Sequence, residues 1–135
     1  MYVVFDTSVL IAAFLNPAGF ASRLVRLTIE GDQFLLCLSE AIILEFESKL
    51  GERDVEPKSL VAFTDVLRSV AVMASVKAFT PEQIASDEHV LACAQDCAAN
   101  LVVSSDKRLV RGLKQLQIAA VRPSEFQGYF ESVSK

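Results

Sequence analysis

The chain has 135 residues and a formal net charge of −4, with 52% hydrophobic and 22% charged residues. This composition excludes a disordered chain. The negative net charge excludes phosphate binding through overall positive charge. A membrane span is excluded because no apolar stretch approaches about 20 residues. The first residues lack the basic start of a signal peptide, so we expect one domain over residues 1–135 that is cytoplasmic and contacts no membrane.

The first half of the chain alternates apolar runs with segments of helical periodicity. Residues 2–5 form a continuous apolar run, which is typical of a parallel strand buried on both faces. The sequence Asn-Pro-Ala-Gly at residues 16–19 predicts a break between two helices. We therefore expect a strand over residues 2–5, a helix capped by Thr7 or Ser8 that runs to about residue 15, a helix over residues 20–31 whose core face holds Phe20, Leu24 and Leu27, a strand over residues 34–38, and a helix from Ser39 to about residue 50.

The second half continues the alternation. Pro57 suits the first turn of a helix. Residues 70–79 are ambiguous and could end in a short strand. We expect a helix from Pro57 with a core stripe of Leu60, Phe63, Leu67 and Val70, a helix over residues 87–99 capped by Ser86 and closed by Asn100, a strand over residues 101–104, a helix from 107 to about 116, and a strand over residues 118–121.

Strands separated by helices favour parallel pairing with right-handed crossovers. The predicted fold class is therefore α/β, a three-layer α/β/α sandwich with a central parallel sheet of four to five strands. Asp6 and Asp106 follow two of the predicted strands, directly or within two residues. They would lie at the carboxyl ends of interior strands, where open α/β sheets place their ligand sites.

Two further acids complete a candidate metal site. Asp87 falls in the first turn of a predicted helix, and Glu45 lies inside the apolar run AIILEF. Carboxylates are the ligands that Mg²⁺ or Mn²⁺ prefers, and clustered carboxylates need a cation or raised pKa values. Each acid also has an ordinary structural explanation: Asp6 and Asp106 can cap helices, Asp87 can complement a helix dipole, and Glu45 can lie on a solvated face.

The order of these segments resembles PIN-domain ribonucleases, the group that includes VapC toxins and related toxin-antitoxin components. The resemblance spans nearly the whole chain, through VVFDTSVLIAAF, LSEAIILEFESKL, SDEHVLACA, LVVSSDKRL and the closing RPSEF. It implies a PIN-like fold and a metal-dependent endoribonuclease, the toxin of a toxin-antitoxin module. It also implies an RNA substrate, a small antitoxin partner and a homodimer.

The resemblance also assigns roles to individual residues. Asp6, Glu45, Asp87 and Asp106 match the metal-binding and catalytic acids, with one or two Mg²⁺ or Mn²⁺ ions. The chain has Ala85-Ser86 where the group often has a denser acidic run with a proline, so Asp87 or Glu88 could reach the metal. Hydroxyl groups beside these acids, which we expect to hydrogen bond to the ligands rather than act as nucleophiles, belong to Thr7, Ser8 and Ser104.

Basic side chains cluster directly after Asp106. Lys107, Arg108 and Arg111, followed by Lys114, could draw an RNA backbone toward the metal. A solvated helix face explains the same run equally well.

A soft metal site is a second reading of the helix that follows Asp87. His89, Cys93 and Cys97 recur every four residues and share one helical face. Three ligands on one straight helix make poor tetrahedral geometry. We therefore expect the cysteines to be buried as small hydrophobic residues. Their odd number, together with Cys37, also argues against a disulfide framework.

Two other functions compete with the ribonuclease. A non-catalytic PIN-like module could bind RNA or protein, although it would have no reason to keep four mutually repelling acids. A phosphoaspartate enzyme would also carry an aspartate after its first strand. However, a dehalogenase-like phosphatase would need a second aspartate at the position of Ser8.

Overall fold

The structure is a computed structural model that describes residues 1–30, 34–75, 88–126 and 128. The predicted helix end at Gly31, the predicted cap Ser86 and the predicted ligand Asp87 lie outside these residues. The elements in chain order are β1 (Tyr2–Phe5), α1 (Thr7–Leu15), α2 (Phe20–Glu30), β2 (Leu35–Leu38), α3 (Glu40–Gly51), α4 (Pro57–Val70), β3 (Val72–Met73), α6 (Glu88–Asp96), β4 (Leu101–Val103), α7 (Lys107–Gln115) and β5 (Ala120–Val121).

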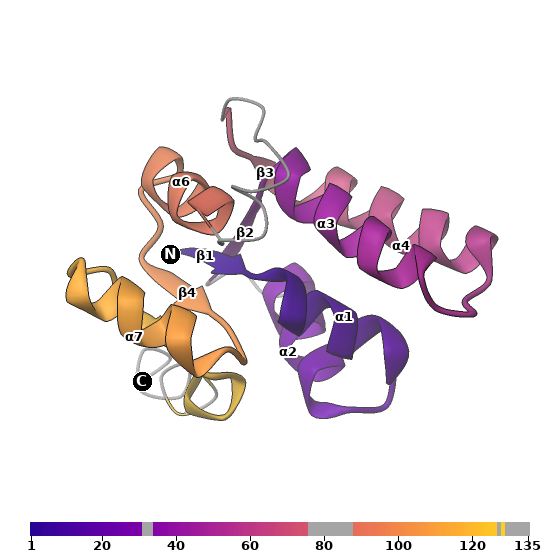
Figure 1. Cartoon of the computed structure of the whole chain (residues 1–135), viewed down its shortest axis with the longest axis horizontal. Helices are drawn as coiled ribbons and strands as arrows, with labels where there is room; N and C mark the ends of the chain where they lie inside the picture. The colour runs from indigo at the N-terminus through magenta and orange to yellow at the C-terminus, as the bar shows by residue number, and fades with distance from the viewer. Residues whose placement is uncertain (31–33, 76–87, 127, 129–135) are drawn as a thin grey trace.

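The sheet has five strands in the order β3-β2-β1-β4-β5, and every pair is parallel. Helices α1 to α4 lie on one side of the strands and α6 and α7 on the other (Figure 1). This is the predicted three-layer α/β/α sandwich. In the first half of the chain, successive strands extend the sheet from β1 toward β3. In the second half, they extend it in the opposite direction, from β4 toward β5. The boundary between β1 and β4 is therefore the switch point of the sheet.

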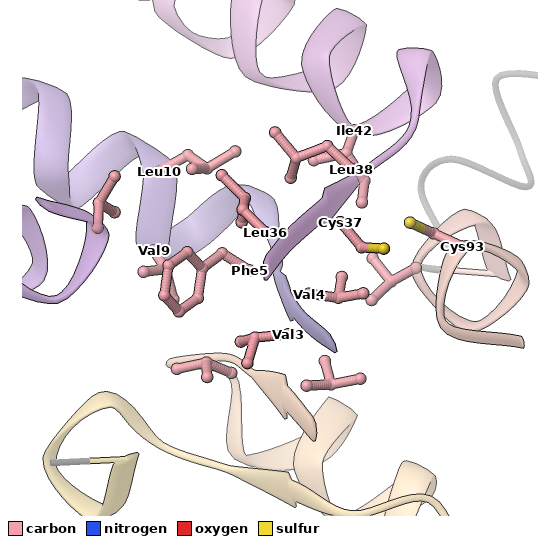
Figure 2. Packing of buried hydrophobic residues seen from close by; sticks show 14 of the residues in the cluster. Val3, Val4, Phe5, Val9, Leu10, Leu36, Cys37, Leu38, Ile42 and Cys93 are labelled. Carbon is pink, nitrogen blue, oxygen red and sulfur yellow. The ribbon is translucent and has the colours of Figure 1, made fainter. Parts of the chain in front are cut away.

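The two strands at this switch point are buried on both faces. Val3, Val4 and Phe5 of β1 have no exposed surface, and neither do the three residues of β4. Side chains of β1 point to helices on both faces of the sheet: Phe5 lies beside Val9 of α1, and Val4 lies on the side of Cys93 of α6 (Figure 2). The unbroken apolar runs in the sequence predicted this burial correctly, because a strand covered by helices on both faces has no polar side.

Two local predictions about helix ends were wrong. The cap of α1 is Asp6 rather than Thr7 or Ser8. The left-handed residue after α6 is Ala98, with φ of 51°, rather than Asn100, whose side chain instead accepts a hydrogen bond from Tyr2 N.

The predicted core stripes of α2 and α4 are correct except at one position each, because Leu24 and Leu67 are buried and Phe20, Leu60 and Phe63 pack against the core. Leu27 is 43% exposed and Val70 is 40% exposed, although both were expected in the core. Thr28 is buried in place of Leu27, which is tolerated because its hydroxyl donates to Leu24 O at 2.9 Å.

In the part of the chain that the structure describes, no single helix is both long and apolar enough to cross a membrane. The pair α1 and α2 meets that criterion only when taken together, across a bend of 107°.

Candidate active site

Asp6 lies at the carboxyl end of β1 and is held from both its backbone and its side chain. Its N–H donates to Val103 O at 3.1 Å, which continues the pairing of β1 with β4. Its Oδ1 accepts from Val9 N at 3.3 Å and caps α1. Only 5% of Asp6 is exposed. The capping explanation is thus correct, but it accounts for only one of the contacts of this carboxylate.

Two serine hydroxyls hold the two oxygens of Asp6. Ser8 Oγ donates to Oδ1 at 2.5 Å, and Ser104 Oγ donates to Oδ2 at 2.6 Å. Each hydroxyl also accepts from the backbone that follows β4: Ser8 Oγ from Ser105 N at 3.2 Å, and Ser104 Oγ from Asp106 N at 3.0 Å. The serines therefore fix the orientation of Asp6 and join the ends of β1 and β4.

Burial raises the pKa of Asp6 above its ordinary value, and the hydrogen bonds from Ser104, Ser8 and Val9 oppose this rise only in part. A buried carboxylate at the carboxyl end of a strand has lost much of its hydration. A nearby cation therefore stabilises its ionised form. This is the electrostatic environment in which a divalent metal ion binds favourably.

Asp106 follows β4 and caps α7. Its Oδ1 accepts from Arg108 N at 2.9 Å and Leu109 N at 3.4 Å. These bonds leave Oδ2 without a hydrogen bond from the described residues. Unlike Asp6, Asp106 is exposed. Its N–H contact with Ser104 brings it to the same end of the sheet as Asp6.

Glu45 is 7% exposed on α3, so it does not lie on a solvated face. Its Oε1 lies 3.5 Å from Lys49 Nζ, and its Oε2 lies 3.5 Å from His89 Nε2 on α6. Burial lowers the pKa of His89 more than the charge of Glu45 raises it. The imidazole is therefore largely neutral at pH 7, and it faces the carboxylate as a polar partner rather than as a full cation.

The structure thus brings Asp6, Ser8, Ser104 and the backbone of Asp106 together, and it places Glu45 against α6. Among the described residues, no group of three or more histidine, cysteine, aspartate or glutamate side chains is placed to hold a metal ion. Thr7 Oγ1 is buried and has no hydrogen bond within the described part of the chain. It is therefore not one of the hydroxyls that contact Asp6.

A family model described as PIN domain matches residues 2–108, which include Asp6, Glu45 and Asp106. The chain belongs to the PIN domain family. No curated protein sequence matches it. Its fold is similar to that in the crystal structure of VapBC2 from Rickettsia felis bound to a DNA fragment from their promoter, with a TM-score of 0.59 and 11% sequence identity. That match covers 90% of this chain and 98% of the other.

The basic residues that follow Asp106 in this PIN domain lie on α7, which begins at the candidate site. Lys107, Arg108 and Arg111 are exposed. Sequence reasoning missed Arg122, which lines the same surface groove as Lys107 and Arg111. No local signal could have identified it, because Arg122 follows β5 and meets α7 only in the folded chain.

The cysteines of the PIN domain are structural, as predicted. Cys37 and Cys93 are fully buried, Cys97 is partly buried, and all three are free thiols. The sulfur atoms of Cys37 and Cys93 face each other between β2 and α6 (Figure 2). Burial, together with the neighbouring Cys97, raises the pKa of Cys37 to about 12. Such thiols remain protonated and pack as small hydrophobic groups.

Proposed function

We propose that this chain, as a single PIN-like domain, is a metal-dependent endoribonuclease that hydrolyses RNA phosphodiester bonds. One observation carries the proposal: Asp6, a buried carboxylate with a raised pKa, is oriented by two serine hydroxyls beside Asp106 at the switch point of the sheet. A helix cap alone does not require this arrangement, since an exposed cap needs neither burial nor hydroxyl donors on both oxygens.

The donors present fit a hard divalent ion such as Mg²⁺ or Mn²⁺. The two aspartates offer carboxylate oxygens at adjacent strand ends, and Asp106 Oδ2 has no hydrogen bond from the described residues. Asp6 and Asp106 would hold the first ion, and Glu45 and Asp87 would complete the set for one or two ions. When bound, the ion supplies charge neutralisation at the phosphate and a water of lowered pKa.

The residues of the chain perform the remaining tasks. Ser8 and Ser104 donate to Asp6 and lower its pKa, so they favour the ionised form that a metal requires. Asp106 stays anchored by the backbone N–H groups of α7. Lys107, Arg108 and Arg111 present positive charge at the same end of the sheet, where the RNA phosphates would lie.

We further propose that the chain is the toxin of a toxin-antitoxin module, acts in the cytoplasm, forms a homodimer and is inhibited by a small antitoxin. One similar solved structure is that of VapBC2 bound to DNA from its promoter, which supports a module of this kind. A groove of about 800 Å³ between the α1–α2 connection and α4 supports a protein partner, because its lining is mainly apolar and includes the half-exposed Leu15 and Val66.

The test is cleavage of RNA by the purified protein in Mn²⁺ or Mg²⁺, compared with EDTA. We expect metal-dependent cleavage that Asp6→Asn abolishes. Asp65→Asn is the matched control, because Asp65 is exposed on α4 and makes the same chemical change away from the site. RNA binding without cleavage in any metal would instead favour the non-catalytic PIN-like module. Cleavage that survives Asp6→Asn would contradict the proposed site.

A further inference from the structure

A groove of about 240 Å³ lies along α7 and the segment that follows β5. Its lining combines two elements that are distant in the sequence, and it consists of Lys107, Val110, Arg111, Lys114, Arg122 and Glu125. Lys107, Arg111 and Lys114 follow one another at intervals of four and three residues, so they lie along one face of α7. Arg122 joins this lining from the segment that follows β5.

The groove has a charge opposite to that of the whole protein. Four cationic side chains and one carboxylate line it, an excess of three positive charges in a chain of net charge −4. Arg122 is paired with Glu125, through Nε to Oε1 at 3.4 Å. Within the described residues, Lys107, Arg111 and Lys114 form no ion pair.

Glu125 neutralises only one of these positive charges. Its hydrogen bond from the Arg122 backbone, together with the charges of Lys114 and Arg122, lowers its pKa. The carboxylate therefore stays ionised and remains engaged with Arg122. Three cations that face one concave surface repel each other, and an anion that enters the groove relieves that repulsion. Arg122, which comes from a separate segment, adds a fourth cation to those of the helix face.

The groove also begins at the candidate site. Lys107 is the first residue of α7 and directly follows Asp106. From Lys107 to Lys114 the helix rises about 10 Å. The basic lining of the groove therefore extends along α7 away from the candidate site.

We propose that this groove binds the phosphate backbone of RNA beyond the bond that is cut. This inference rests on the proposed function for the identity of the polymer. Lysine and arginine contacts to phosphates carry no base information, so the groove strengthens binding of any RNA sequence. Arg108, which does not line the groove, is not part of it.

The experiment measures binding of labelled oligouridine in Mg²⁺ at several salt concentrations. All proteins carry Asp6→Asn, so that the RNA stays intact. The test variant adds Arg111→Gln and Lys114→Gln. The matched control adds Arg53→Gln and Lys58→Gln, which remove the same charge from exposed positions near the start of α4, on the other side of the sheet (Figure 1).

We expect the test variant to bind about tenfold more weakly near 0.15 M salt. Its slope of log K against log salt should be smaller by about 1.4, since each phosphate contact to a single strand contributes about 0.7. The control pair should leave the slope unchanged. Equal slopes in the test variant and its parent would overturn the proposal, and so would binding of a polyglutamate peptide in preference to oligouridine.

These outcomes are separate from the test of cleavage. If the groove substitutions weaken RNA binding but the protein with Asp6 intact never cuts RNA, the groove proposal is supported and the proposed ribonuclease activity is rejected. If the protein cuts RNA but the groove substitutions leave RNA binding unchanged, the ribonuclease activity is supported and the groove proposal is rejected. The fold of each variant is checked by thermal unfolding, which should match that of the Asp6→Asn parent because all four additional substituted side chains are exposed.

Discussion

Ser104 and Asp6 lie 98 residues apart in the sequence, and the Ser104 hydroxyl donates a hydrogen bond of 2.6 Å to Asp6 Oδ2. The same hydroxyl accepts from Asp106 N at 3.0 Å. Ser104 therefore links the two aspartates that follow β1 and β4. Its own exposed surface is zero, so water does not replace it readily.

Replacing Ser104 should weaken catalysis without removing a ligand. We expect Ser104→Ala to reduce RNA cleavage by about 10- to 100-fold, the usual effect of losing a hydrogen bond to a metal ligand. The loss should be partly recovered at high Mn²⁺, because the affinity for the ion is what falls. Ser105→Ala is the control, since its exposed side chain makes no contact with Asp6. Equal activity of the two variants would show that Ser104 has only a structural role.

We expect the buried carboxylate of Asp6 to lower the free energy of unfolding at neutral pH, although the proposed function requires it. Burial raises its pKa in the folded state, so its contribution to stability is present below pH 3.8 and is lost as the pH rises through the folded value. In EDTA at pH 7, Asp6→Asn should therefore increase the free energy of unfolding by about 1 kcal/mol. The difference from the wild type should vanish below about pH 4. Urea unfolding at both pH values measures this, and a loss of stability at pH 7 would refute it.

The end of the described chain should be essential for the core, although the family match stops at residue 108. Phe126 is fully buried and meets Phe5 and Phe34 at ring-centroid distances of 5.9 and 5.3 Å. Phe126→Ala should lower the free energy of unfolding by about 3–4 kcal/mol because it leaves a cavity against β1. Leu116→Ala, at a residue that is 59% exposed, should cost less than about 0.5 kcal/mol. Similar losses in both variants would contradict this packing.

The cysteines should differ in reactivity. At pH 8 we expect an alkylating reagent to modify Cys97 in the native protein well before the other two, which are fully buried. Mass spectrometry after digestion reads the order of modification, and Cys97→Ala should remove the fast phase. Rapid modification of Cys37 would show that β2 and α6 separate easily.

The burial of the Cys37 thiol also makes the free energy of unfolding depend on pH. Because the folded pKa of Cys37 is raised from 9.0 to about 12, its contribution to stability is complete below pH 9 and is lost between pH 9 and 12. A Cys37→Ala variant should therefore show a shallower loss of stability over that range, as measured by urea unfolding. An unchanged pH dependence would contradict the burial of this thiol.

The sequence predicts the strands better than the details of the helices. The apolar runs at β1 and β4 are unambiguous, because a strand that is covered on both faces has no polar positions. The core face of α2 is predicted less completely: Leu27 is exposed and Thr28 is buried, because the threonine hydroxyl donates to Leu24 O.

The candidate site shows the same division. Because Asp6 and Asp106 each follow a predicted strand, the sequence alone predicts that they lie at the same end of the sheet. The partners of Glu45 depend on how α3 meets α6, and the groove with Arg122 depends on how residues 122–126 meet α7. Contacts of this kind are set by tertiary packing, which no local pattern in the sequence encodes.

The central place of β1 in the sheet has a consequence for synthesis of the protein. β1 leaves the ribosome long before β4, which is one of its two neighbours in the folded sheet. Until Ser104 has emerged, the carboxylate of Asp6 lacks its second hydroxyl and its neighbouring aspartate. A growing polypeptide therefore lacks the assembled candidate site until β4 is free to pair with β1.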